Sequence, residues 1–313
     1  MKKSIILFVL VAIFTFQVDA QRNKRWKRYR YEVVAGLGVS NFMGELGGSN
    51  EMGSNFVKDF EFSMTRAAAN IGIRYRILDK LSTKLGFTYG RLRGDDALTE
   101  QPQRQNRNLN FYADIYEMSG QIEYSIVSEK VGHKYSLRRA RGIKDLNLNT
   151  YFFTGLAGFY FNPYGQDPFS EEWVELQPLG TEGQGRVGSR EKYSLWQVAV
   201  PIGIGVKYGL DRVWSIGLEF GTRFTFTDYI DDVSKTYYDY DEMYAEDPLA
   251  ARLSDPSLDR LDDEKPITQT AVNQQRGDAK DDDMYMFLLI TLNYKLKTTR
   301  KGLPKFNMGR RSF

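Results

Sequence analysis

The sequence predicts an all-β fold, namely an eight-stranded antiparallel transmembrane β-barrel with short periplasmic turns and long extracellular loops. Eight segments alternate apolar residues with small or polar ones, and long connections alternate with shorter ones between them. A strand points successive side chains to opposite faces, so each segment has one apolar face. A soluble sandwich also alternates, but here the polar face is rich in Gly and the apolar face ends in aromatics. This combination is typical of a membrane barrel with lipid outside and a narrow, filled lumen.

The alternation is clearest in the sixth segment, where every even position from Trp196 to Tyr208 is apolar and Gly or polar residues predominate between them. Segments 214–226 and 284–294 repeat the pattern. Weaker copies occupy 31–40, 70–77, 81–90, 116–126 and 151–161. In the fifth segment we expect the apolar, lipid-facing side to consist of Tyr151, Phe153, Ala157, Phe159 and Phe161.

The connections set the orientation of the barrel. Two of them, 78–80 and 209–213, are tight turns, whereas 42–65, 92–110, 162–192 and 227–282 are long. An even number of strands leaves both termini on one side, and short turns belong to the periplasmic side of such barrels. We therefore expect both termini in the periplasm.

The N-terminal residues are typical of a secretory signal peptide. Lys2 and Lys3 precede an apolar stretch, 4–16, that is too short for a membrane span, and a small residue, Ala20, ends the leader. We therefore expect an exported protein of the outer membrane, and the absence of Cys excludes a disulfide or a Cys-linked lipid anchor. The predicted organisation is a signal peptide at 1–20, a basic periplasmic segment at 21–30, the barrel at 31–294 with a long acidic loop at 227–283, and a basic periplasmic tail at 295–313.

Charge separates by side, although the formal net charge is only +3. The loop 227–283 holds 17 acidic and 6 basic residues, while the periplasmic segments are basic. A basic rim attracts anionic lipid headgroups, at about 1 kcal/mol per residue, or docks an acidic periplasmic protein. The predicted rim is Arg22, Lys24, Arg25, Lys27, Arg28, Lys134, Arg138, Arg139, Arg141, Lys295, Lys297, Arg300 and Lys301.

The polar faces of the strands predict a nearly balanced set of charges in the lumen. Side chains can fill an eight-stranded barrel, and buried charges are tolerated when they are paired and hydrogen-bonded. We interpret the set as a structural plug, with a proton or solute path as the alternative. It comprises Glu32, Arg74, Arg76, Lys84, Glu117, Glu123, Lys207, Glu219 and Arg223.

The sequence offers little for catalysis. The single His, His133, has no obvious partner, and neither a phosphate loop nor a nucleophile elbow is present. We expect neither an enzyme nor a cofactor, and export argues against a nucleic-acid partner. The acidic loop could hold Ca²⁺, although it lacks the spacing of a calcium loop, and a solvated acidic surface is the alternative. The candidate ligands are Asp228, Asp231, Asp232, Asp239 and Asp241.

Three stretches resemble a PorG-like outer-membrane β-barrel family of Bacteroidota that is associated with type IX secretion. Residues 36–48 (GLGVSNFMGELGG) resemble its first strand and loop. The pattern Arg107-x-Leu109-x-Phe111-x-x-x-Ile115-x-Glu117 is similar to the start of its fourth strand, and 151–160 to its fifth. The resemblance implies a barrel without enzyme activity that anchors a periplasmic lipoprotein ring of the secretion machine.

We therefore expect an outer-membrane scaffold that contacts lipid and holds periplasmic ring components through its basic face. Two alternatives stay open at this point. One is a small channel, and the other is a surface receptor or adhesin that acts through the acidic loop.

Overall fold

The computed structural model describes residues 24–46, 62–99, 101–129, 147–186, 190–261, 270–299 and 302–305. The predicted signal peptide at 1–20 lies outside the described residues. None of the described helices has both the length and the apolar character needed to cross a membrane.

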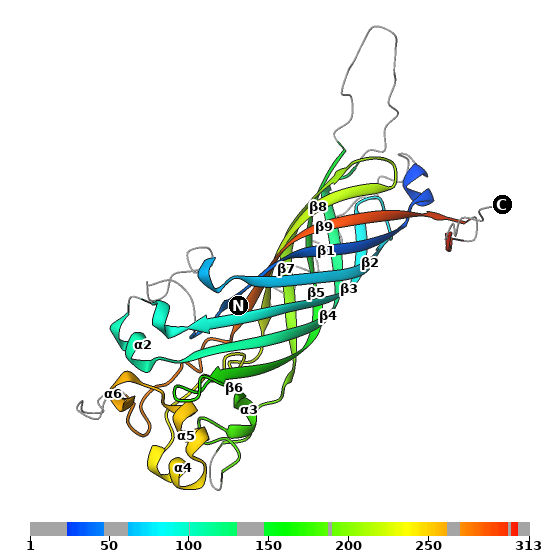
Figure 1. The fold of residues 1–313 in the computed structure, drawn as a ribbon. Coiled ribbons are helices and arrows are strands. Elements are labelled where there is room, and N and C mark those ends of the chain that lie inside the picture. The colour runs from blue at the N-terminus through cyan, green and yellow to red at the C-terminus, as the bar shows by residue number, and fades with distance from the viewer. Residues whose placement is uncertain are drawn as a thin grey trace, which may run out of the picture.

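Eight long antiparallel strands close into a barrel, as the alternation predicts (Figure 1). Each pairs with its neighbours in the order β1-β2-β3-β4-β5-β7-β8-β9, and β9 pairs with β1 from Met43↔Met284 to Tyr31↔Leu296, which closes the ring. Each strand of the ring is therefore paired on both sides and the sheet has no free edge, as a lipid environment demands. The strands are β1 (Tyr31–Met43), β2 (Arg66–Arg76), β3 (Leu81–Asp95), β4 (Asn110–Val127), β5 (Leu148–Gln166), β7 (Trp196–Gly209), β8 (Trp214–Thr225) and β9 (Met284–Thr298).

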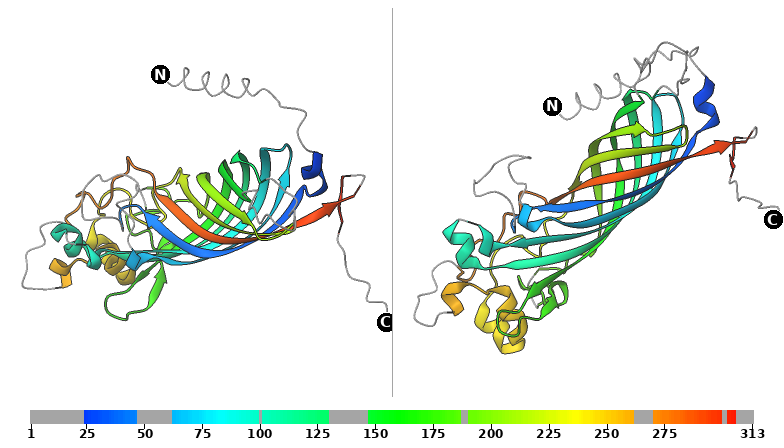
Figure 2. Two further views of the ribbon diagram at one scale, coloured as in Figure 1. Left: turned by 90° about the horizontal axis from the view of Figure 1, so that it is seen from above. Right: turned by 45° about the horizontal axis from the view of Figure 1, so that its top comes forward.

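The two ends of the barrel differ (Figures 1 and 2). One end, called here the terminal end, carries the turns after β2 and β7, the 3-10 helix η1 (Lys24–Arg28) and the short strand β10 (Pro304–Lys305). The other, called the loop end, carries the long connections and the short elements in them. These elements are η2 (Phe62–Met64), η3 (Asp96–Leu98), α2 (Pro102–Arg107), β6 (Trp173–Glu175), α3 (Leu176–Leu179), α4 (Tyr240–Glu246), α5 (Pro248–Ser254) and α6 (Leu258–Leu261).

The outer surface of the barrel is apolar. Leu37 and Leu156 are each 72% exposed, and Ile71, Met118 and Ile290 are exposed on neighbouring strands. A soluble domain rarely exposes a continuous apolar patch of this extent, whereas a transmembrane barrel presents such a band to lipid. The period-two alternation predicted this facing, and the structure confirms it for β1, β2, β4 and β9.

Aromatic side chains mark a level on the outer surface. Tyr89, Tyr116, Tyr160 and Trp196 stand directly opposite one another on β3, β4, β5 and β7. Their ring centroids lie 5.3, 6.4 and 5.3 Å apart in turn. Aromatic belts of this kind lie at the interface between hydrocarbon and water. The strands β3, β4 and β5 continue past this level into the loop end.

The predicted facing of β5 is wrong. Tyr151, Phe153 and Phe159 point into the lumen, and Phe152 and Leu156 face outward instead. Both faces of β5 are largely apolar, so alternation alone could not decide between them.

The inward aromatics of β5 lie over glycines of the next strands. A Cβ at Gly203 would be 2.4 Å from the Phe153 ring, and one at Gly205 would be 2.3 Å from the Tyr151 ring. Glycine therefore makes the room in which these rings pack, and the pairing cannot be seen from β5 alone.

The lumen changes character along its length. Near the terminal end it is charged, as described below. Towards the loop end it becomes a hydrophobic core around Phe42, Phe111, Phe159, Phe161 and Phe287. This core continues past the strand ends to Ile230 and Val233, so the loop segments pack onto it. The predicted acidic loop is therefore, in its described part, a folded layer that caps the barrel.

Candidate functional site

The charged part of the lumen is organised around Arg74 of β2. Its guanidinium donates from Nε to Glu123 (2.6 Å), from Nη1 to Glu32 (2.9 Å) and from Nη2 to Glu219 (2.9 Å). It also donates to Asn293 Oδ1 at 2.9 Å. Five N–H donors in a fixed fork suit such a shared position, which a lysine could not fill.

Every strand of the barrel contributes to this cluster, which we call the lumen network. Lys84 of β3 donates to Glu219 Oε2 at 2.5 Å, and Lys207 of β7 donates to both oxygens of Glu32, at 2.9 and 2.7 Å. Tyr151 of β5 donates to Glu219 Oε1 at 2.5 Å. The network thus ties the eight strands together across the lumen. Its charges balance, with three cations (Arg74, Lys84 and Lys207) and three carboxylates (Glu32, Glu123 and Glu219).

Two further ion pairs flank the lumen network. On the side of the loop end, Arg223 donates to Glu117 at 2.9 Å, and Tyr285 donates to the same carboxylate at 3.0 Å. On the other side, Lys295 donates to both oxygens of Glu129, at 2.6 and 2.5 Å. All of these charged side chains are buried.

The structure thus brings together eight of the nine residues predicted for the lumen. Arg76, the ninth, lies half-buried among residues that line a pocket at the terminal end. The Lys295–Glu129 pair was missed. Lys295 was assigned to the exposed basic rim, and that assignment is wrong because β9 runs four residues past Tyr294 and turns this lysine inward.

The remaining rim residues are described only in part. Lys27, Arg28 and Lys297 are exposed at the terminal end. Helix η1 includes Lys24 and Arg25, whose side chains are outside the described part of the structure. The other predicted rim residues, which also lie outside the described residues, are Arg22, Lys134, Arg138, Arg139, Arg141, Arg300 and Lys301.

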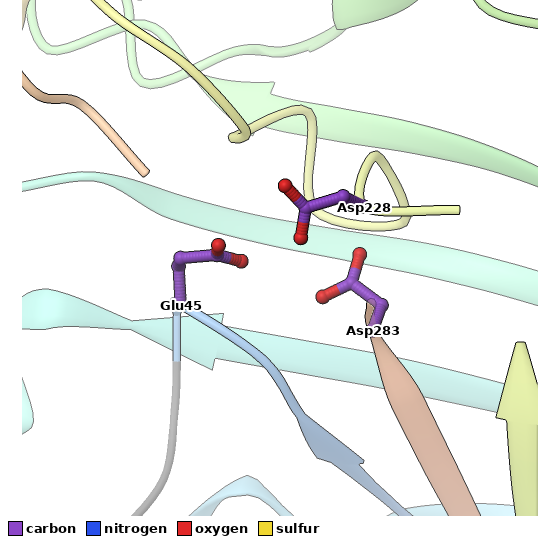
Figure 3. Close-up of side chains that lie close together, drawn as sticks. All are labelled: Glu45, Asp228 and Asp283. Atoms are coloured by element: carbon purple, nitrogen blue, oxygen red, sulfur yellow. The ribbon is translucent and has the colours of Figure 1, made fainter. Parts of the chain in front are cut away.

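A second cluster of charged groups lies at the loop end, where β1, β8 and β9 meet. Glu45 follows β1, Asp228 follows β8, and Asp283 immediately precedes β9 (Figure 3). Each offers a carboxylate oxygen that lies within 4.8 Å of those of the other two. We call these three residues the carboxylate cluster. Sequence reasoning missed Glu45 and Asp283 as members, since only the closure of the barrel between its first and last strands brings them together.

Backbone hydrogen bonds hold the cluster in place. Asp283 N donates to Thr227 O at 2.9 Å, and Ile230 N donates to Asp283 Oδ2 at 2.8 Å. Asp278 N donates to Glu45 Oε1 at 3.0 Å. Within the described residues, no donor meets hydrogen-bond geometry with the remaining oxygens, which are Glu45 Oε2, both oxygens of Asp228 and Asp283 Oδ1.

Burial shifts the protonation of these carboxyls. It raises the pKa of Glu45 to about 8, with the charge of Asp228 adding to the effect. It raises the pKa of Asp228 to about 8 as well, against the opposing effect of the Ser234 hydroxyl. The pKa values of Asp231 and Asp283 also rise well above the ordinary range, because both are buried and surrounded by the other carboxylates.

The candidate calcium ligands predicted from the acidic loop do not form one site. Asp228 belongs to the carboxylate cluster, and Asp231 lies beside it with its oxygens taken by Leu46 N and Val233 N, each at 3.0 Å. Asp232 accepts from Thr181 and Tyr193. Asp239 caps helix α4, whose first turn contains Asp241. These five aspartates therefore do not share one site, because local hydrogen bonds and a helix cap use the side chains of Asp231, Asp232 and Asp239.

A family model described as a domain of unknown function, DUF6089, matches residues 3–246. The chain belongs to the DUF6089 family. No curated protein matches it. Three solved structures illustrate what the DUF6089 chain is similar to, at TM-scores too low to carry a further conclusion. They are Neisserial surface protein A (9% identity, 85% of this chain and 96% of that one, TM-score 0.36), Ail of Yersinia pestis in complex with a heparin analogue (8%, 86% and 99%, 0.35) and OprG of Pseudomonas aeruginosa (8%, 87% and 98%, 0.33).

Proposed function

We propose that this protein is a non-conducting scaffold of the outer membrane, which holds a periplasmic partner through a basic face at its terminal end. The observation that carries the proposal is the lumen network. An ion or solute would have to pass a cluster to which all eight strands contribute and in which six buried charges are paired. Opening such a path would leave buried charges without partners, which costs several kcal/mol for each ion. A rigid anchor suits this interior better than a channel does.

The terminal end has the charge of a docking surface. Lys27, Arg28 and Lys297 are exposed there. In the sequence, the connection between β4 and β5 and the tail after β9 are also rich in basic residues. The Arg30 guanidinium lies 5.1 Å from the Trp26 ring centroid and donates to Tyr75 at 2.9 Å, so η1 is tied to the barrel wall. A fixed basic surface of this kind favours an acidic partner and sets its orientation.

The resemblance of residues 36–48, 107–117 and 151–160 to the PorG-like family suggests which partner this is. We infer a periplasmic lipoprotein of the ring in a type IX secretion or gliding machine. In this proposal the barrel supplies the attachment to the membrane, and outer-membrane lipid surrounds it.

Recovery of the partner from detergent extracts tests the proposal. We expect a variant with Arg138, Arg139 and Arg141 changed to Gln to recover at least fivefold less of the periplasmic partner than the unchanged protein. The matched control is Lys280→Gln, which removes an exposed cation at the loop end and should leave recovery unchanged. Equal recovery by all three proteins would contradict docking. If the triple variant lost only its binding to anionic vesicles, the rim would serve lipid contact alone, and docking would likewise be contradicted.

One observation favours a second candidate, a surface receptor that acts at the loop end. The described part of the acidic loop is folded, with helices α4 and α5 packed on a small core of Met243, Ala250 and Ala251. Replacing residues 240–254 by a short Gly-Ser linker tests this candidate. A receptor would lose its ligand, whereas a periplasmic anchor would keep its partner.

A further inference from the structure

The carboxylate cluster and the adjacent Asp231 differ from the other buried acidic groups of the loop end, which form ion pairs with arginine. Asp96 pairs with Arg107 at 2.6 Å, and Glu182 pairs with Arg276 at 3.3 Å. Similar pairs join Asp167 to Arg252 and Asp255 to Arg260. Among the described residues, by contrast, neither Lys nor Arg forms an ion pair with a member of the carboxylate cluster. Asp231 is held instead by the backbone N–H groups of Leu46 and Val233, so within the described part of the chain the three members of the carboxylate cluster are the group that lacks both an ion pair and a full set of donors.

Two side chains of the cluster are deeply buried and aim oxygens without partners at one point. Asp283 is 1% exposed and Asp228 is 7% exposed. Figure 3 shows both carboxylates turned towards each other and towards Glu45. Among the described residues, no donor meets hydrogen-bond geometry with Asp283 Oδ1 or with either oxygen of Asp228, although the Ser234 hydroxyl lies near enough to Asp228 to lower its pKa. A buried charged oxygen without a donor is costly, and a cation removes that cost.

Gly44 makes room for this arrangement. A Cβ at position 44 would lie 2.2 Å from Asp283 Oδ1 and 2.3 Å from the Phe42 ring. Any other residue would push the Asp283 carboxylate away from its present position. Glu45 and Gly44 are the accessible members of the region, so a cation could enter from their side.

The spacing suits a calcium ion. Ca²⁺ binds oxygen ligands at about 2.3–2.6 Å, so two oxygens on opposite sides of it lie up to about 4.6–5.2 Å apart. The three ligand atoms here lie within 4.8 Å of one another. All three ligands are oxygen atoms, which Ca²⁺ prefers. The site has none of the His nitrogen or Cys sulfur ligands that are typical of Zn²⁺ sites. Mg²⁺ prefers to keep several waters, and a site with two deeply buried ligands suits it less.

We propose that Glu45, Asp228 and Asp283 bind one Ca²⁺ ion, which fastens the folded acidic loop to the seam where β1 and β9 close the barrel. The ion would bridge the ends of β1, β8 and β9, three consecutive strands of the ring. Asp231 lies beside the site, and its own oxygens stay on backbone N–H groups. This role is separate from docking at the terminal end, and either could hold without the other.

Terbium luminescence tests the site directly on the full barrel purified in detergent and stripped with a chelator. Tyr229 follows Asp228 and Tyr285 lies two residues after Asp283, so excitation of tyrosine should sensitise a bound Tb³⁺ ion. We expect saturable luminescence with one site per chain. Added Ca²⁺ should displace the signal, and the same concentration of Mg²⁺ should do so at least tenfold less effectively.

Two neighbouring aspartates provide the matched variants. Asp283→Asn should weaken Tb³⁺ and Ca²⁺ binding at least tenfold, whereas Asp282→Asn, which changes the adjacent exposed side chain, should alter binding less than twofold. The heat-dependent shift of the barrel in electrophoresis reports that each variant is folded. If Asp283→Asn does not fold, Asp228→Asn takes its place. Absence of binding by the unchanged protein, or equal binding by the Asp283 and Asp282 variants, would overturn the proposal.

Discussion

Replacing Arg74 should remove the part of the lumen network that joins the most strands. The Arg74→Met variant keeps much of the side-chain volume but removes donors to Glu32, Glu123, Glu219, Asn293 and Tyr151. We expect a large loss in the free energy of unfolding, because the carboxylates stay buried after their shared cation is gone.

The three carboxylates would not be affected equally. Glu32 would keep Lys207, and Glu219 would keep Lys84 and Tyr151. Glu123 would lose its ion pair, and its other oxygen, Oε1, has no partner to begin with. One stranded buried charge costs about 3–5 kcal/mol, and this is the loss we expect. Adding Glu123→Gln to Arg74→Met should recover part of it.

Urea unfolding of the barrel in lipid vesicles, followed by tryptophan fluorescence, measures this loss. The matched control is Arg91→Met. Arg91 forms a two-point pair with Asp114 at 2.8 Å for each contact, but its side chain is 45% exposed. Such a pair contributes about 0.2–1 kcal/mol. A loss below about 1 kcal/mol for Arg74→Met, equal to that of the control, would refute the claim that the network holds the barrel together.

Two further predictions concern the packing of the lumen and the protonation of the loop end. Gly205→Ala places a methyl group 2.3 Å from the Tyr151 ring and should destabilise the barrel by about 1–3 kcal/mol. The control is Gly158→Ala, because a Cβ at position 158 would have no neighbour within 4 Å among the described residues. Equal urea midpoints for the two variants would contradict the packing described. In a chelator, stability should fall as pH rises from about 5 to 8, because burial raises the pKa of Glu45 and of Asp228 to about 8, so the folded state holds protons that the unfolded state releases. Melting temperatures measured at pH 5 and pH 8 check this prediction, and a melting temperature that rises with pH would contradict it. The charged groups that face Glu45 and Asp228 include Arg107, Asp231 and Asp283.

The sequence predicts the eight strands and most of their facing because a membrane barrel imposes a strict two-residue period. The prediction failed at β5, where Phe153 was expected to face lipid. Aromatic residues suit both environments, and only the glycines of the neighbouring strand, such as Gly203, reveal that the ring has space inside. Facing was therefore predictable where one side of a strand is polar, and not where both sides are apolar.

The sequence predicts most members of the lumen network, but it predicts neither how they pair nor which residues form the carboxylate cluster. Alternation places Arg74 and Glu219 in the lumen, yet which carboxylate meets which cation depends on the stagger of the closed barrel. Lys295 was missed because the last strand continues past its apolar part and brings this lysine to Glu129. The carboxylate cluster joins Glu45 to Asp283 across almost the whole chain, and only closure between the first and last strands makes them neighbours.

Conductance across a planar lipid bilayer tests the central claim, a barrel whose lumen is filled, most directly. After insertion of the purified protein, confirmed by its protection from protease, we predict no steady current steps at either polarity. A variant that removes the network, with Arg74, Lys84 and Lys207 changed to Ala, should show openings if it still folds. Steady openings of the unchanged protein would contradict the account.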